Sequence, residues 1–310
     1  MENRTLGHSG IAVSALSLGS WMTWETMEER DARAVLEAGL AAGITFLDDA
    51  RYNDRTGKAP MKSGYSEVLF GRLLREIGAP RQRLVIANKL WFEFFPKESL
   101  EAELDGSLSR LQMDYLDIVY CERLPAAVRL DETIAELDRL ITAGKLRAWG
   151  VLNWGAGEIA EAVRVARANG HRPPSGAQLA YSVLTRESIE ASDMAAACAD
   201  GGVGIVASYS LYGGLLTGKY RDAAGEGRLA DQLADERTQA MLPKVDRFLS
   251  IAADAGCPPP QLAMAYCLKN PQVSSVVFGA RSIAQLEENL GALGVAQRLA
   301  AGTLTALRTL

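Results

Sequence analysis

Hydrophobic positions along the chain alternate between two patterns. Short runs of consecutive apolar residues, typical of buried strands, are each followed by a longer stretch in which apolar residues recur every three or four positions, as on one face of a helix. The predicted strands cover residues 15–18, 45–47, 84–88, 116–120, 147–151, 177–179, 203–207 and 275–278. The predicted helices that follow them cover residues 28–42, 66–75, 97–111, 130–143, 157–169, 189–200, 260–270 and 282–293.

Eight strand–helix units in 310 residues predict a closed (β/α)8 barrel, the TIM barrel, because an open doubly wound sheet usually has fewer units. No linker rich in Pro, Gly and Ser divides the chain, so residues 1–310 are expected to form a single domain. Residues 1–13 are expected to form a β-hairpin across one end of the barrel. Two long loops, 53–65 and 212–235, are candidate lids, and an extra helix is expected after the second, as far as about Ala255.

The composition narrows the range of partners. The 33 basic and 38 acidic residues give a net charge of −5, and no long basic run occurs, so nucleic acid and anionic membranes are poor candidates. A small molecule is the expected partner. The N-terminus lacks an apolar signal core and no stretch of about eighteen apolar residues occurs, which indicates a soluble protein without a membrane span.

Cysteine and histidine positions argue against a metal centre and a disulfide framework. The four cysteines form no Cys-x-x-Cys pair, and the two histidines, His8 and His171, lie in turn-like surroundings. We therefore expect no bound metal, and reduced thiols in a cytoplasmic protein.

The end of the second predicted strand carries the clearest candidate chemistry. Asp48, Asp49 and Tyr52 follow it, at the edge where parallel α/β sheets hold their active sites, and the third strand leads to Lys89. If Lys89 lies between Asp48 and Tyr52, its ammonium favours the phenolate and lowers the tyrosine pKa from about 10, which gives a proton donor at neutral pH. The alternative is a surface loop with an ordinary ion pair, and the spacing alone leaves both open.

Seven short motifs follow one another along the chain in a familiar order. They are Leu6–Ser14, Gly43–Asp48, Asn88-Lys89, Tyr115–Asp117, Gly150–Trp154, Gly213–Tyr220 and Gly279–Ser282. With these motifs the whole chain resembles the aldo-keto reductase superfamily, and most closely its potassium-channel β-subunit-like branch. The resemblance implies an NADP(H)-dependent reductase with a catalytic tetrad of Asp, Tyr, Lys and His.

Three members of that tetrad carry over to this chain. Asp48 matches the aspartate and Lys89 matches the lysine. Tyr52 resembles the tyrosine, although the family spacing would place it at Asn53, so its loop must be one residue shorter. Tyr65, which directly precedes the next family helix, is the alternative proton donor.

The fourth member differs, because Glu122 stands where the family motif has histidine. This exchange resembles that of family members that reduce conjugated carbon–carbon double bonds, where a protonated carboxyl donates a hydrogen bond to the enone oxygen. An ionised Glu122 would instead favour a cationic substrate such as an iminium. Burial would favour the first state and exposure the second. The sequence leaves a carbonyl, an imine and a conjugated alkene open as the reduced group.

The last strand–helix junction is the expected adenosine end of the cofactor site. A helix that starts at Ser282 directs free backbone N–H groups and its dipole at whatever lies there, which would suit an adenosine 2′-phosphate. The resemblance implies that this end of NADP(H) is held by Gly279, Arg281, Gln285, Glu288 and Asn289. Ser282 and Gln285 also have the spacing of a capping box, and the two roles can coexist.

The resemblance implies further cofactor contacts at three places. Asn153 and Gln178 match the residues that bind the nicotinamide carboxamide, and either Ser208 or Tyr209 would lie against the ring. A loop over the pyrophosphate is expected to contribute Leu211, Gly213, Lys219 and Arg228. Its Gly-x4-Gly-Lys run imitates a P-loop, but Tyr220 follows where a P-loop has Ser or Thr for magnesium, so an ATPase is not expected.

Trp21, Trp91 and Trp154 follow predicted strand ends, and we expect them to line a bulky apolar substrate pocket unless they pack in the core. The first functional hypothesis is an NADP(H)-dependent oxidoreductase with Tyr52 as proton donor. The alternative is an NADP(H)-binding regulatory or scaffold subunit with little turnover, and a cofactor-free isomerase or lyase is a third. The substrate, the stereochemistry and the number of subunits stay open, a homo-oligomer included.

Overall fold

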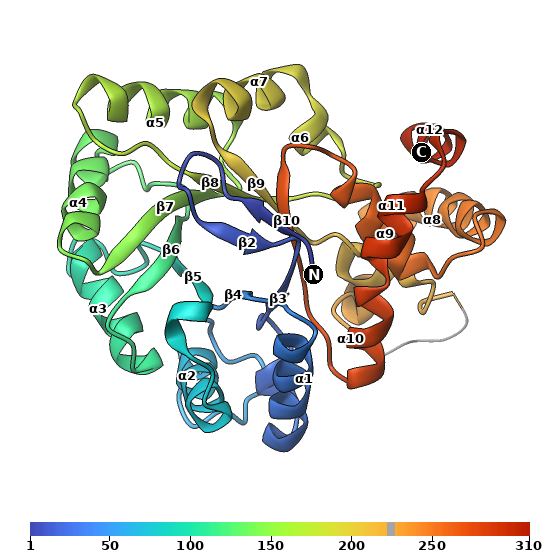
Figure 1. Ribbon diagram of the computed structural model, residues 1–310, viewed down its shortest axis with the longest axis horizontal. Coiled ribbons are helices and arrows are strands. Elements are labelled where there is room, and N and C mark those ends of the chain that lie inside the picture. Colours follow the sequence, from blue (N-terminus) through green and yellow to red (C-terminus); the bar gives the residue numbers. More distant parts are fainter. Residues whose placement is uncertain (222–226) are drawn as a thin grey trace.

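The computed structural model describes residues 1–221 and 227–310 and forms a closed barrel of parallel strands surrounded by helices (Figure 1). The strand order around the barrel is β10-β3-β4-β5-β6-β7-β8-β9. These strands are β3 (Leu16–Gly19), β4 (Phe46–Asp48), β5 (Val85–Leu90), β6 (Leu116–Cys121), β7 (Leu146–Leu152), β8 (Gly176–Ala180), β9 (Gly204–Ser208) and β10 (Val273–Phe278). The predicted (β/α)8 barrel is confirmed.

The helices follow the strands as the sequence pattern predicts. They are α1 (Glu29–Ala41), α2 (Tyr65–Ile77), α3 (Leu100–Leu111), α4 (Leu130–Thr142), α5 (Ala156–Ala168), α6 (Glu187–Glu190), α7 (Ser192–Gly201), α8 (Glu236–Asp254), α9 (Pro259–Leu268), α10 (Ile283–Leu290), α11 (Ala292–Arg298) and α12 (Ala301–Arg308). Short 3-10 helices are η1 (Trp24–Thr26), η2 (Arg81–Arg83), η3 (Tyr212–Thr217) and η4 (Ala230–Gln232). The extra helix expected after the second long loop is α8, whereas residues 222–226 of that loop lie outside the described residues.

Three helix boundaries differ from the prediction for local reasons. Helix α3 starts three residues late because the Ser99 hydroxyl caps it, accepting the Ala102 N–H at 3.1 Å. The predicted helix 189–200 is divided into α6 and α7 at Ala191, whose backbone is extended. The last predicted helix is divided into α10 and α11 at Gly291.

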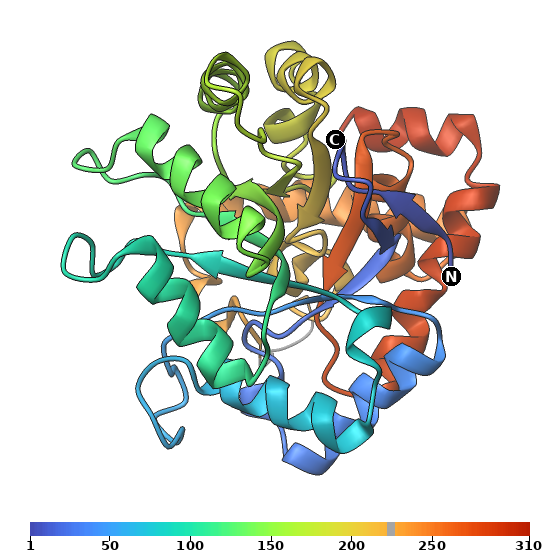
Figure 2. The ribbon, with the colours of Figure 1, turned by 60° about the vertical axis from the view of Figure 1, so that its left-hand side comes forward.

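The N-terminal hairpin closes one end of the barrel, as expected (Figures 1 and 2). Its strands β1 (Asn3–Thr5) and β2 (Ala12–Ser14) pair antiparallel. Leu6, Ile11 and Val13 are buried in one cluster with side chains from inside the barrel. A side chain at Gly7 would lie 2.2 Å from the Ser175 carbonyl oxygen, so glycine is required for this close packing.

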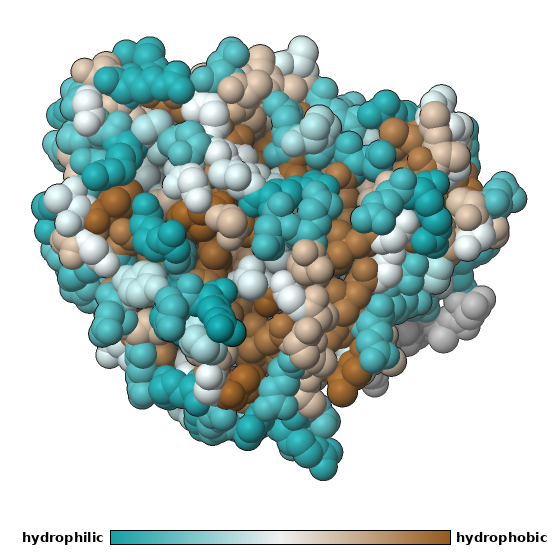
Figure 3. All heavy atoms as spheres, in the orientation of Figure 1, coloured by the Kyte–Doolittle hydropathy of each residue, from teal (hydrophilic) through white to brown (hydrophobic). Residues whose placement is uncertain are grey.

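The apolar core has two parts. One fills the barrel interior, and the larger one lies between the strands and the surrounding helices, where Trp149 donates its indole N–H to the Arg172 carbonyl oxygen at 2.8 Å. Figure 3 shows hydrophilic residues over most of one face, with apolar residues gathered near its middle. Because apolar side chains fill the barrel interior, we expect catalytic groups at the strand ends and in the loops beyond them.

None of the described helices is by itself long and apolar enough to span a membrane. One sharply bent pair of segments, Ile283–Arg298 with Ala301–Arg308, has the length and composition of a membrane span when the two are taken together.

Candidate active site

The predicted pair of Asp48 and Lys89 is formed at the carboxyl ends of β4 and β5. The Lys89 ammonium donates to Asp48 Oδ1 and also to the Asp49 carbonyl oxygen at 3.2 Å. Gln178, from β8, donates its amide N–H to the same Asp48 oxygen at 3.1 Å. All three side chains are buried, so the ion pair and the amide form one rigid group at the edge of the barrel.

Tyr52 lies above this edge, between two tryptophan rings. Its ring centroid is 6.5 Å from that of Trp21 and 6.2 Å from that of Trp91. The predicted lowering of its pKa is wrong: burial, followed by the charges of Asp48 and Asp49, raises the pKa of Tyr52 well above its ordinary value. The physical reason is that burial of the phenol disfavours its charged form, and the carboxylates of Asp48 and Asp49 disfavour it further.

Both candidate proton donors, Tyr52 and Tyr65, line the same small cavity of about 10 Å³. The cavity lies between η1 and the loop 53–65, where Asn53 and Ser63 form an isolated antiparallel bridge. Tyr52 also packs against the two tryptophans, and the Asp48 charge contributes to raising its pKa.

Glu122 directly follows β6 and is half-buried. Its backbone N–H donates to the Leu90 carbonyl oxygen at 2.9 Å, which holds it beside the end of β5. One carboxylate oxygen accepts the Arg123 N–H at 3.0 Å. Glu122 is therefore attached to the same end of the barrel as Lys89, on the neighbouring strand.

The residues expected at the nicotinamide end lie on β8 and β9 or directly after β7 and β9. Asn153 has a left-handed backbone, with φ of 54°, and its amide oxygen accepts the Ala180 N–H at 3.1 Å. Its own N–H donates to the Gln178 carbonyl oxygen at 2.9 Å. Ser208 ends β9, and Tyr209 follows it, so all four predicted residues lie at the same end of the barrel as Asp48.

The loop expected over the pyrophosphate folds back onto the first strand–helix loop. Arg228 donates to the Trp21 carbonyl oxygen and its guanidinium lies 4.9 Å from the centre of a Trp21 ring. A side chain at Gly213 would meet Leu229 at 2.7 Å and the Tyr209 hydroxyl at 2.8 Å. Leu211 precedes η3, and the Lys219 ammonium lies 4.8 Å from the Tyr220 ring centre.

The adenosine end consists of Gly279 and the start of α10. A side chain at Gly279 would lie 2.5 Å from Thr23 and 3.3 Å from the Arg228 guanidinium, so only glycine leaves this approach open. The Ser282 hydroxyl accepts the Gln285 N–H at 3.2 Å, and the Gln285 side chain accepts the Arg281 N–H at 2.8 Å, one residue before the position of a true capping box. The Arg281 and Glu288 side chains are exposed and Asn289 is buried.

A family model described as the aldo/keto reductase family matches residues 15–302. The chain belongs to this family. A relative from Oryza sativa subsp. japonica, named probable voltage-gated potassium channel subunit beta, is 33% identical and covers 95% of this chain and 92% of its own length. A relative with the same name from Arabidopsis thaliana is 31% identical with the same coverage. The resemblance inferred from the seven motifs is confirmed.

The aldo/keto reductase barrel keeps only two of its three expected pocket tryptophans at the mouth. Trp21 is 36% exposed and Trp91 is half-buried, and both flank Tyr52. Trp154 is only 4% exposed and packs in the layer between strands and helices. Trp21 and Trp91 therefore form the accessible part of an apolar rim.

A buried carboxyl group beside the ion pair is the main feature that sequence reasoning left unassigned. Asp49 is fully buried, and its Oδ1 accepts the hydroxyls of Ser20 and Ser66, the latter at 2.6 Å, while Oδ2 makes no hydrogen bond to the part of the chain that the structure describes. Burial, with a smaller contribution from the Glu67 charge, raises the pKa of Asp49 to about 7. Its position next to Asp48 was the only available signal.

Two further buried carboxylates support the strand that carries Lys89. Glu67 pairs with Arg110 and accepts the Asn88 amide N–H at 2.9 Å, and the Asn88 oxygen accepts the Lys89 N–H at 2.6 Å. Glu103 accepts the Trp91 N–H at 2.8 Å, and burial raises its pKa. No pattern in the sequence marks either residue, because both lie on amphipathic helices.

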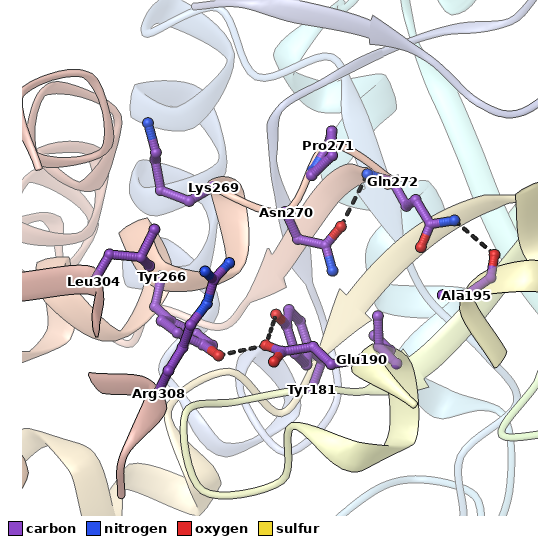
Figure 4. A pocket seen from close by; sticks show the side chains of 11 residues that line it. Tyr181, Glu190, Ala195, Tyr266, Lys269, Asn270, Pro271, Gln272, Leu304 and Arg308 are labelled. Atoms are coloured by element: carbon purple, nitrogen blue, oxygen red, sulfur yellow. Dashed lines mark hydrogen bonds between the residues drawn. The ribbon is translucent and has the colours of Figure 1, made fainter. Parts of the chain in front are cut away.

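A cavity of about 280 Å³ lies away from this edge, between α6, α9 and α12 (Figure 4). Glu190 there accepts the hydroxyls of Tyr181, at 2.7 Å, and Tyr266. None of the predicted site residues lines this cavity. Among the described residues, no cluster of His, Cys, Asp and Glu could hold a metal ion.

Proposed function

We propose that this chain is an NADP(H)-dependent oxidoreductase that reduces a carbonyl, an imine or a conjugated carbon–carbon double bond of a small, fairly apolar substrate. The observation that carries the proposal is the buried group of Asp48, Lys89 and Gln178 beneath Tyr52 at the mouth of an aldo/keto reductase barrel. An ordinary ion pair in a surface loop, the alternative reading of the sequence, would lie exposed to solvent. Here three polar side chains from three strands are buried together, at a cost in desolvation.

The residues around the barrel mouth fit the cofactor that the family implies. Gly279 leaves the backbone open beside Arg228, and the exposed Arg281 lies at the start of α10, where helix N–H groups and a guanidinium suit a phosphate. Asn153 and Gln178 offer amide groups at the other end. When bound, NADPH would supply the hydride.

Tyr52 would hold the proton that the substrate needs. Its raised pKa keeps the phenol protonated at neutral pH, so it can donate a hydrogen bond to the oxygen or nitrogen of the reduced group. The ion pair of Asp48 and Lys89 would form the base of the site below the reduced group of the substrate. Trp21 and Trp91 would exclude water and select an apolar substrate.

Glu122 would decide which substrate class is preferred. A protonated Glu122 donates to the oxygen of an enone, and an ionised Glu122 stabilises the positive charge of an iminium. The ratio of turnover between an enone and a cyclic imine, measured in the wild type and in Glu122→Gln, separates the two states. Loss of imine reduction alone in the variant indicates the ionised state.

The test is NADPH oxidation by the purified protein with panels of aldehydes, enones and cyclic imines. We expect oxidation with at least one panel, a loss of about 10²-fold or more in Tyr52→Phe, and little change in Tyr65→Phe, the matched control. NADPH should raise the melting temperature of all three proteins. No oxidation in any panel, with Tyr52→Phe indistinguishable from the wild type, would remove the proposal.

The second candidate function is an NADP(H)-binding regulatory subunit, which the names of the two relatives favour. It predicts tight NADPH binding, negligible turnover with every panel and a stable protein partner in a pull-down. The free cysteines of the chain, three of them buried, suit a reducing compartment, so we propose a cytoplasmic location for either function.

A further inference from the structure

A small cavity behind Tyr52 joins the candidate proton donor to two carboxyl groups. Its lining includes Tyr52, Glu25 of η1, Asp54 near the start of the loop 53–65, and Ser66 of α2. Its volume of about 10 Å³ is close to the smallest that accommodates one water molecule, about 10–15 Å³. The space therefore suits a single bridging water rather than a substrate.

Glu25 places a carboxyl oxygen at this cavity without a partner. Its Oε2 is buried and makes no hydrogen bond to any described residue. Burial is the largest influence on its pKa and raises it; Asp54 raises it further, while two backbone N–H groups and Arg228 lower it. The negative charge of Glu25 in turn contributes to raising the pKa of Tyr52, so the two groups interact electrostatically.

Asp54, the second carboxyl group, has the opposite environment. It accepts the Thr56 N–H and the Thr56 hydroxyl, each at 2.7 Å, and the Ala59 N–H at 3.3 Å. These bonds lower the pKa of Asp54 and keep it ionised. Two neighbouring carboxyl groups whose pKa values are pushed apart are the usual arrangement for passing a proton.

We propose that Glu25 returns protons to Tyr52, through one water molecule in this cavity, after each reduction. The inference rests on the proposed function. After Tyr52 has given its proton to the substrate, the O–H bond of the Glu25 acid breaks, its proton passes to the water, and a water proton passes to the Tyr52 phenolate oxygen. Solvent then reprotonates Glu25 past Asp54, and no electrons are transferred in these steps.

Other proton routes to Tyr52 are less direct. The Lys89 ammonium is held by Asp48 and by the Asp49 carbonyl oxygen, so a proton leaving it would break the buried ion pair. Asp49 reaches the cavity only through the Ser66 hydroxyl. Of the described residues that line the cavity, only Glu25 has a buried carboxyl oxygen that makes no hydrogen bond to another described residue.

The test compares Glu25→Gln with Glu28→Gln, a matched control whose carboxyl is exposed at the start of α1. Infrared difference spectra of wild type minus Glu25→Gln should contain the C=O band of a protonated carboxylic acid at pH values above the ordinary pKa of a glutamic acid. The alkaline absorbance titration of Tyr52, isolated by subtracting Tyr52→Phe, should move to lower pH in Glu25→Gln, because a nearby negative charge is removed. Glu28→Gln should change neither signal.

Kinetics give the third readout. In Glu25→Gln the first turnover should keep the wild-type rate of NADPH oxidation within about twofold, while steady-state turnover falls by about tenfold or more. Glu25→Asp should recover part of the loss. Wild-type steady-state turnover in Glu25→Gln would overturn the inference.

The relay and the proposed function can fail separately. A wild-type protein without turnover would remove the proposed function, and the infrared and Tyr52 titrations would still report on Glu25. The absence of the acid band together with an unchanged Tyr52 titration would overturn the relay, whatever the turnover.

Discussion

Asp48 and Asp49 are neighbours in the sequence, yet their carboxyl groups have opposite surroundings. Asp48 faces a cation and an amide, whereas Asp49 receives two hydroxyl hydrogen bonds and has no cation among its described partners. The difference follows from strand geometry, because successive side chains point to opposite sides. One carboxyl serves the ion pair, and the other is a buried acid that holds a proton up to about pH 7.

This acid should make stability depend on pH. In the unfolded chain the pKa of Asp49 is about 3.9, and in the folded chain it is about 7, so the folded state binds the extra proton between these values. The contribution of Asp49 to the free energy of unfolding is fully present below the lower pKa and is lost as the pH rises through the higher pKa. Asp49→Asn should therefore gain stability relative to the wild type between pH 4 and 7, by roughly 4 kcal/mol in total, and then level off.

The measurement is urea unfolding at several pH values, with the exposed Asp114→Asn as control. A constant difference between Asp49→Asn and the wild type across the range would show that Asp49 does not hold the proton.

The pairing of Asp48 with Lys89 could be predicted, because the two strands are adjacent. The pKa directions of Tyr52 and Asp49 could not, because burial depends on the path of the loop 53–65.

At the scale of elements, the inside of the barrel depends on two glycines that make room for one tyrosine. Gly150 of β7 and Gly176 of β8 both face the ring of Tyr120, from β6. The Lys89 ammonium lies 5.8 Å from the centre of that ring. The hydrophobic pattern predicted every barrel strand, but which small residue faces which ring depends on register, which the pattern does not contain.

Gly150→Ala should be strongly destabilising. The added methyl carbon would lie 2.3 Å from the Gly176 carbonyl oxygen and 2.9 Å from the Tyr120 ring, and overpacking of this kind costs about 1–3 kcal/mol or more. At Gly157, in α5, an added methyl would meet no described atom within 4 Å beyond its chain neighbours and its own helix backbone, so Gly157→Ala should instead stabilise by about 0.5–1 kcal/mol. Urea unfolding of both variants checks the pair, and equal effects would contradict the packing.

At the scale of the whole molecule, loops far apart in the sequence meet at one end of the barrel. Arg228, which follows η3, reaches the Trp21 loop and approaches Gly279 after β10. The loops that follow β9, β3 and β10 therefore meet at the mouth, beside the predicted cofactor residues. The family motifs predicted these positions, whereas the contact of Arg228 with Trp21 joins two loops whose shapes no sequence pattern specifies.

The guanidinium of Arg281 at the adenosine end of the site predicts a preference for NADPH over NADH. Arg281→Ala removes the exposed guanidinium at the start of α10, and we expect NADPH affinity to fall by about 10–100-fold, the worth of one charge-assisted bond. NADH affinity should change little, because NADH lacks the 2′-phosphate. Fluorescence titrations measure both, with Arg298→Ala as control, and an equal loss for the two cofactors would contradict the assignment.

The central claim is that this barrel transfers hydride from NADPH to a substrate carbon beneath Tyr52. The most direct measurement uses NADPH carrying two deuterium atoms at C4, with the best substrate from the panels and mass spectrometry of the product. The account predicts one deuterium on the reduced carbon with the wild type, and none above background with Tyr52→Phe. A product without deuterium, or tight NADPH binding with no labelled product from any panel, would contradict it.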